Sequence, residues 1–78
     1  MKIVFTLHAI ERIKTRGINR SEVVLCIANP DKVDKLDGIT RAIKKRDSGV
    51  LLVFYRSENS NVVVITAYRS SKRHKYLK

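Results

Sequence analysis

The chain has 78 residues, of which 17 are Lys or Arg and 7 are Asp or Glu, so its formal net charge is +10. This length allows one domain, residues 1–78, and the 44% of hydrophobic residues is ordinary for a folded protein. The sequence has no apolar run near the ~20 residues of a membrane span. Its one cysteine, Cys26, excludes an internal disulfide and cannot form a zinc site alone. We expect a cytoplasmic, cationic domain without cofactor, metal or membrane association that binds a polyanion.

The first helix is predicted over Leu7–Arg16 from the residues at its two ends. Thr6 is a typical N-cap, because its hydroxyl can accept from a free backbone N–H of the first turn. Gly17 suits the left-handed conformation that often ends a helix, and Ile18 can then pack back on the last turn.

A second helix is predicted over roughly Arg20–Ala28. Asn19 followed by Glu22 is a variant of the capping box, in which the carboxylate accepts from the backbone N–H of the cap residue. The helix must end near Asn29-Pro30, since the residue before a proline avoids the α region.

The remainder of the chain is predicted to form strands. Lys32–Leu36 and Ile39–Arg46 flank Asp37-Gly38, a two-residue signal for a type I′ hairpin turn. Val50–Tyr55 and Val62–Ala67 are apolar almost throughout, which is typical of central strands, and a polar turn over 57–61 joins them.

The predicted fold class is therefore α+β, with two N-terminal helices packed on one face of a four-stranded, twisted antiparallel sheet. Lys2–Phe5 would add a fifth strand at an edge. Residues 70–78 form a basic C-terminal tail whose order the sequence leaves open.

Three basic side chains recur at intervals of four along the first helix: His8, Arg12 and Arg16. This spacing places them in one row, and like charges at this spacing repel each other, so helix stability does not require them. Arginines suit phosphate recognition and a histidine can transfer protons near neutral pH. The alternative is an ordinary solvated helix face.

A second basic cluster follows the last acidic residue of the chain, Glu58. Tyrosines alternate there with Lys and Arg, a composition suited to stacking on bases while binding phosphates. The candidate nucleic-acid-binding residues in this cluster are Arg69, Lys72, Arg73, Lys75 and Tyr76, with Tyr68 among them. Tyr55 is a further candidate, because it could face the same region from the neighbouring strand, although the sequence does not fix the register. The alternative is that the tyrosines border the core and that the tail only confers solubility.

The pattern His8-Ala9, Arg12, Arg16-Gly17-Ile18, then Glu22-Val23 and Asn29-Pro30-Asp31, resembles a family of small prokaryotic domains of unknown function. That family is grouped with the RelE, ParE and BrnT toxins, and the end of the chain, 63–77, is similar as well. The resemblance implies a RelE/BrnT-like fold.

The resemblance also implies a metal-independent endoribonuclease of a toxin–antitoxin system, which cuts RNA by attack of the 2′-hydroxyl on the adjacent phosphate. The catalytic residues would then be His8, Arg12, Arg16 and Tyr68, with the histidine moving protons and the arginines stabilising charge. Two other functions remain open: a non-catalytic nucleic-acid-binding module, and a protein-interaction domain for an acidic antitoxin. A homodimer through strand edges or helices is a further expectation.

Overall fold

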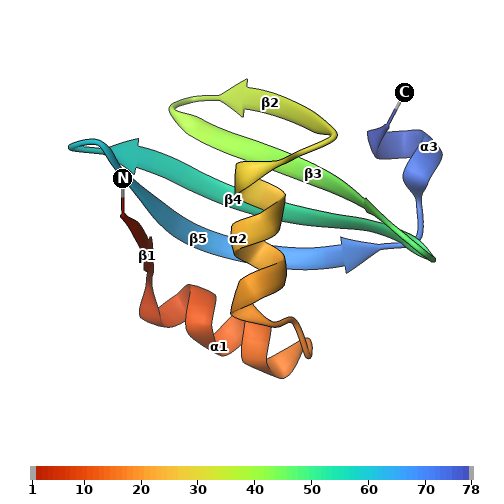
Figure 1. Cartoon of the computed structure of the whole chain (residues 1–78), viewed down its shortest axis with the longest axis horizontal. Coiled ribbons are helices and arrows are strands. Elements are labelled where there is room, and N and C mark those ends of the chain that lie inside the picture. Colours follow the sequence, from red (N-terminus) through yellow and green to blue (C-terminus); the bar gives the residue numbers. More distant parts are fainter. Residues whose placement is uncertain (1, 78) are drawn as a thin grey trace.

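The computed structural model describes residues 2–77, and within them five strands form one sheet in the order β1-β5-β4-β3-β2 (Figure 1). The strands are β1 (Ile3–Phe5), β2 (Lys32–Leu36), β3 (Ile39–Arg46), β4 (Gly49–Glu58) and β5 (Asn61–Ser70). The predicted α+β class is therefore observed. The predicted helix-then-strand order is observed only in part, because β1 precedes the helices and a third helix, residues 73–76, follows the last strand.

The sheet is mixed, which corrects the prediction of an antiparallel one. β2 to β5 are antiparallel neighbours, as tight turns between consecutive strands require, whereas β1 pairs with β5 in parallel, with Ile3 opposite Val62 and Phe5 opposite Val64. β1 is joined to the rest of the sheet through helices rather than through a hairpin, so no local turn signal fixed its direction.

Helices α1 (Leu7–Thr15) and α2 (Arg20–Ala28) begin and end close to the predicted positions. The Thr6 hydroxyl accepts from the Ala9 N–H at 3.0 Å. Gly17 has a φ of +66°, and the Ile18 N–H donates to the Ile13 carbonyl at 2.8 Å, which closes α1 in a Schellman motif.

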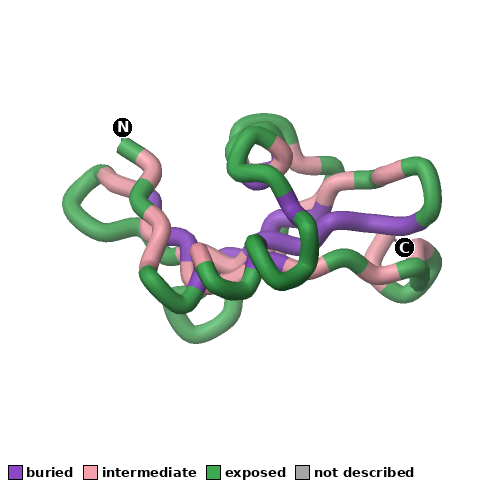
Figure 2. Tube along the Cα trace, turned by 90° about the horizontal axis from the view of Figure 1, so that it is seen from below, coloured by how far each residue is buried: buried purple, intermediate pink, exposed green. Residues whose placement is uncertain are grey.

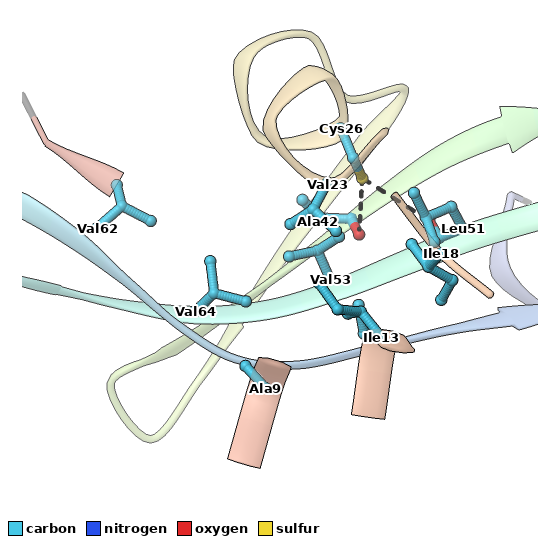
Figure 3. Packing of buried hydrophobic residues seen from close by; sticks show 11 residues of the cluster. Ala9, Ile13, Ile18, Val23, Cys26, Ala42, Leu51, Val53, Val62 and Val64 are labelled. Carbon is cyan, nitrogen blue, oxygen red and sulfur yellow. Dashed lines mark hydrogen bonds between the residues drawn. The ribbon is translucent and has the colours of Figure 1, made fainter. Parts of the chain in front are cut away.

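Both helices pack on one side of the sheet, here called the helix face, with α1 along β5 and α2 across β3 and β4 (Figure 1). The core beneath them joins Ala9, Ile13, Ile18 and Val23 to strand residues such as Val53 (Figure 3). Burial is concentrated in the central strands, while turns and outer helix surfaces are exposed (Figure 2). The helix face therefore holds the larger part of the core.

Cys26 belongs to this core. Its thiol donates to the Ala42 carbonyl at 3.5 Å and lies 3.8 Å from the Leu51 carbonyl oxygen (Figure 3). Burial raises the pKa of the thiol to about 12. The side chain is thus a small core residue and not a nucleophile.

The opposite side of the sheet, here called the second face, carries a smaller core of Ile43, Val50 and Leu52. The C-terminal tail covers it: a short helix, α3 (Arg73–Tyr76), places Tyr76 and Leu77 against these residues. The sequence left the order of this tail open, because its apolar residues are too few to reveal a docking face by periodicity.

Two turns differ in what they require of their glycines. Asp37 and Gly38 have φ of +52° and +78°, which confirms the predicted type I′ turn between β2 and β3. At Gly49 the requirement is space instead. The backbone of Ser70 passes so close to Gly49 that a Cβ there would overlap the Ser70 carbonyl. Only glycine lets β5 leave the sheet toward α3 at this point.

No helix within residues 2–77 is both long enough and apolar enough to cross a membrane.

We predict that Gly49→Ala destabilises the protein by about 1–3 kcal/mol, since the new methyl group must displace backbone at Ser70. The free energy of unfolding from urea denaturation measures this loss. Gly38→Asn is the control, because open space surrounds Gly38 and asparagine tolerates its left-handed backbone. Equal stability of the two variants would contradict the close approach at Gly49.

Candidate nucleic-acid interface

One edge of β5 is only partly covered by another strand. β1 pairs with Val62–Val64, and from there α1 runs beside β5 in place of a strand. The Arg16 guanidinium reaches the open part of this edge, where Nη1 donates to the Ala67 carbonyl at 2.7 Å. A basic side chain of α1 therefore lies at the boundary between the two faces of the sheet.

The predicted row on α1 is present, and its members interact in part. Arg12 Nε donates to His8 Nε2 at 3.2 Å, so these two side chains contact each other across one helical turn. Arg16 lies two helical turns beyond His8, roughly 12 Å along the axis. Since residues four apart share one side of a helix, the row lies beside the open edge of β5.

Tyr68 is the strand residue that the structure brings to this row. The Arg16 guanidinium carbon lies 5.8 Å from the centroid of the Tyr68 ring, a cation–π distance. The Tyr68 ring also stacks on Phe54, with centroids 5.8 Å apart and planes inclined by 22°. Arginine, tyrosine and phenylalanine thus form a continuous layer at the second face.

Tyr55, the aromatic residue expected beside Tyr68, lies on the other side of the sheet. It packs against the core of the helix face, and Phe54 takes the place beside Tyr68. A register shift between Phe54 and Tyr55, opposite Thr66 and Val64 of β5, separates the two aromatics. The sequence could not show which of the two adjacent aromatics would face Tyr68.

The tail adds a second tyrosine to this surface. Arg41 of β3 and Lys75 of α3 lie 5.5 and 5.4 Å from the centroid of the Tyr76 ring. Burial raises the pKa of Tyr68, and the Tyr68 hydroxyl, through a hydrogen bond, lowers the pKa of Tyr76. The two phenols therefore lie side by side, and the tail brings its charge to the same surface.

A straight row of side chains crosses the second face, one from each of four strands: Thr66, Phe54, Arg41 and Asp34. Arg41 Nε donates to Asp34 Oδ2 at 3.1 Å, and this arginine lowers the pKa of the carboxyl. No sequence motif indicated Phe54, Arg41 or Asp34 as site residues. The alternation of β3 placed Arg41 on one strand face, but only the register aligns it with the other two.

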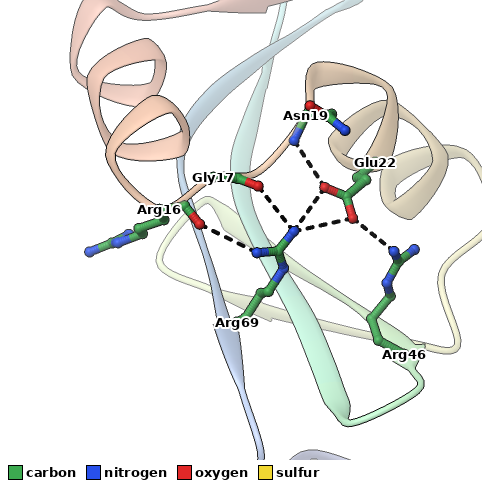
Figure 4. Close-up of polar contacts among 6 residues, drawn as sticks. All are labelled: Arg16, Gly17, Asn19, Glu22, Arg46 and Arg69. Carbon is green, nitrogen blue, oxygen red and sulfur yellow. Dashed lines mark hydrogen bonds and ion pairs between the residues drawn. The ribbon is translucent and has the colours of Figure 1, made fainter.

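Two of the predicted binding residues have their guanidinium groups engaged within the protein. Arg69 donates to the Arg16 and Gly17 carbonyls at 3.3 and 3.2 Å and to Glu22 Oε2 at 3.1 Å (Figure 4). Arg73 donates to the Asp47 carbonyl at 2.8 Å and to the Gly49 carbonyl at 3.2 Å. Both hold segments of the fold together, a role that the sequence did not predict.

Glu22 is the centre of the first of these networks, called here the Glu22 cluster: Glu22, Arg46, Arg69 and the backbone of Arg16–Asn19 (Figure 4). Its carboxylate accepts from the Asn19 N–H at 2.9 Å and from Arg46 at 2.8 Å. The cluster joins the turn between the helices to the ends of β3 and β5. The Arg16 side chain points away from it (Figure 4).

Two lysines of the tail are exposed. Lys72 immediately precedes α3, and Lys75 lies within α3, next to Tyr76. From Asn59 to the C-terminus the sequence has no acidic residue. The described residues contain no group of three or more His, Cys, Asp or Glu side chains that could hold a metal ion. The exposed charge of this region is therefore available to a polyanion.

Comparison with protein families gives one match: a family described as a domain of unknown function, DUF4258, covers residues 5–72. Because the match spans most of the chain, the protein belongs to this family. Searches of curated proteins and of solved structures find no significant match. The relation to the RelE, ParE and BrnT toxins stays a prediction.

We predict that Glu22→Gln lowers the free energy of unfolding at pH 7 by about 1–3 kcal/mol, because the Glu22 side chain is only 14% exposed and two guanidinium groups lose their anion. The Asn19 N–H, followed by Arg69 and Arg46, holds the pKa of Glu22 below its ordinary 4.5. Its stabilisation is therefore fully present above pH 4.5 and is lost as the pH falls through the lower, folded-state pKa.

The measurement is urea denaturation of both proteins at pH 7 and at successively lower pH, with Glu11→Gln as the control, since Glu11 is an exposed helix residue. The difference in the free energy of unfolding between wild type and Glu22→Gln should narrow below pH 4.5. A gap that does not change with pH would contradict the role of the ionised carboxylate.

Proposed function

We propose that this DUF4258 domain binds single-stranded RNA, with the second face of its sheet and the open edge of β5 as the binding surface. The observation that carries the proposal is the layer of Arg16, Tyr68 and Phe54. Aromatic rings and arginine planes together suit unpaired bases, because every base has a π-face that can stack on them.

The distribution of charge supports a nucleic acid over an uncharged ligand. The layer of Arg16, Tyr68 and Phe54 is called here the aromatic layer, and His8, Arg12 and Arg16 are called the α1 row. Lys72 and Lys75 border the aromatic layer, and the α1 row borders it on the side of Arg16. Lys72, Lys75, Arg12 and Arg16 are exposed, so phosphates can reach them, although Arg12 also donates to His8 and Arg16 to the Ala67 carbonyl. Phosphate contacts would then supply affinity, while stacking would favour single strands over duplexes.

We predict that the protein binds a fluorescent ten-residue RNA single strand with an affinity that falls as salt rises. The logarithmic slope should be near −0.7 for each phosphate contacted. Tyr68→Leu should weaken binding by about tenfold through lost stacking. The double variant Lys72→Ala/Lys75→Ala should make the slope shallower by about one unit or more.

Fluorescence anisotropy measures these affinities, and Lys14→Ala is the matched control. Lys14 is an exposed lysine of α1 that lines the groove toward α2, away from the aromatic layer. Affinity that does not depend on salt, or equal losses in Lys14→Ala and the double variant, would refute the binding surface.

RNA cleavage is the second candidate function, and the contact between His8 and Arg12 in the exposed α1 row favours it. In that reaction the 2′-oxygen attacks the phosphorus, a base removes the 2′-proton, and an acid protonates the departing 5′-oxygen. His8 could act as the base only after Arg12 leaves Nε2. The arginines, with Tyr68 beside Arg16, would stabilise the charge on the phosphate.

We predict, for this candidate, that the purified protein cuts RNA in the presence of EDTA and that its expression arrests growth. His8→Ala and Arg12→Ala should each lower the cleavage rate about 100-fold, the usual contribution of a proton-transfer group. Gel electrophoresis of labelled RNA follows the reaction. Uncut RNA with undiminished binding would leave the domain a non-catalytic binding module.

An acidic antitoxin partner and a homodimer also remain proposals. β2 is the outer strand of the sheet, with no strand beyond it among the described residues, so it could pair with a strand of either partner.

A further inference from the structure

A pocket of about 320 Å³ opens on the second face beside the turn between β2 and β3. Its apolar lining comes from Leu36, Ile39 and Phe54, and Leu36 is 75% exposed although it is a large hydrophobic residue. Asp34, Asp37 and Arg41 supply its polar groups. A few polar groups around an apolar, aromatic surface are typical of a small-ligand site.

We propose that this pocket receives one unpaired nucleobase that carries an exocyclic amino group, such as cytosine. The inference rests on the proposed function, because the base would belong to the single-stranded RNA bound on the second face. It adds a site and a base preference that stacking on the aromatic layer alone does not give.

The charges of the pocket decide which part of the RNA enters it. Two carboxylates, Asp34 and Asp37, line it and would repel a phosphate. The ring of Phe54 offers a flat apolar surface on which a base can stack. The phosphates would instead stay near Arg16 and the lysines of the tail, so the base points inward and the backbone outward.

Asp34 provides the acceptor that selects among bases. Among the described residues its hydrogen bonds with Arg41 all use Oδ2, which leaves Oδ1 open to a ligand. The nearby arginine lowers the pKa of this carboxyl, so at neutral pH it can only accept. Cytosine offers an N4 amino donor where uracil offers the O4 acceptor, so the carboxylate favours cytosine.

The pocket also continues the surface described above. Phe54 lines the pocket and stacks on Tyr68, which in turn contacts Arg16. A strand that crosses β5, β4, β3 and β2 along the row from Thr66 to Asp34 would therefore meet the aromatic layer first and the pocket last.

The test compares two ten-residue single strands, oligocytidine and oligouridine, by fluorescence anisotropy at pH 7 and fixed salt. The two pyrimidines are of equal size and the backbones carry equal charge, so phosphate contacts cancel in the ratio. We expect the wild-type protein to bind oligocytidine about five- to tenfold more tightly, the value of one hydrogen bond to a charged group in a partly exposed site.

Asp34→Asn should bring the ratio close to one, because an amide can both donate and accept. Glu58→Gln is the matched control, since Glu58 is another ion-paired carboxylate of the same sheet, more exposed than Asp34, and lies outside the pocket. It should keep the wild-type ratio.

Leu36→Ser, which removes an apolar wall of the pocket, should lower affinity for oligocytidine more than for oligouridine. Leu25→Ser is its control, because Leu25 is a 49% exposed leucine of α2. Circular dichroism verifies that each variant is folded, so that a changed ratio reports on the pocket.

The outcomes separate this inference from the proposed function. Equal affinity of the wild-type protein for both strands, or a preference that survives in Asp34→Asn, overturns the base pocket while RNA binding stands. Absence of binding to either strand at low salt overturns both. Self-association that Leu36→Ser abolishes, without an effect on the ratio, would assign the pocket to a protein contact and overturn the inference.

Discussion

One carboxylate holds the turn between the two helices to the ends of β3 and β5. Glu22 accepts from the N-cap of α2, from Arg46 at the end of β3 and from Arg69 near the end of β5. Arg69 also donates to the Arg16 and Gly17 carbonyls just after α1, so one network ties the turn between the two helices to the sheet. A carboxylate that is 14% exposed must be paired in this way, because an unpaired charge there would lose its hydration without compensation.

In this protein of net charge +10, some arginines hold the fold together and others point outward. Arg46 and Arg69 serve the fold, and Arg73 holds the turn before β4, whereas the Arg16 side chain points away from the cluster toward β5 and Tyr68. A high positive charge is therefore not equivalent to a uniform binding surface. Exposed basic side chains of α1 and of the tail lie near the layer of Arg16, Tyr68 and Phe54, and others, such as Lys35 and Arg56, lie elsewhere on the surface.

The second face can serve as a binding surface because it is covered only in part. α3 buries the row of Ile43 and Leu52, whereas the adjacent row of Phe54, Arg41 and Asp34 remains half-buried. On the helix face, by contrast, two full helices bury most of the central strand residues, among them Ala42, Val53 and Ala67. Function is thus expected where a short chain has too few residues to cover both sides of its sheet.

The sequence by itself determined the two helices with their caps, the Asp37-Gly38 turn, the strands β2 to β5 and the cationic character of the chain. These features depend on neighbouring residues, through capping, turn conformation and alternation. Only the tertiary structure decided the parallel pairing of β1, the docking of α3, the internal role of Arg69, and that Phe54 rather than Tyr55 stacks on Tyr68. Each depends on strand register or on contacts between residues far apart in sequence, and no local pattern encodes these.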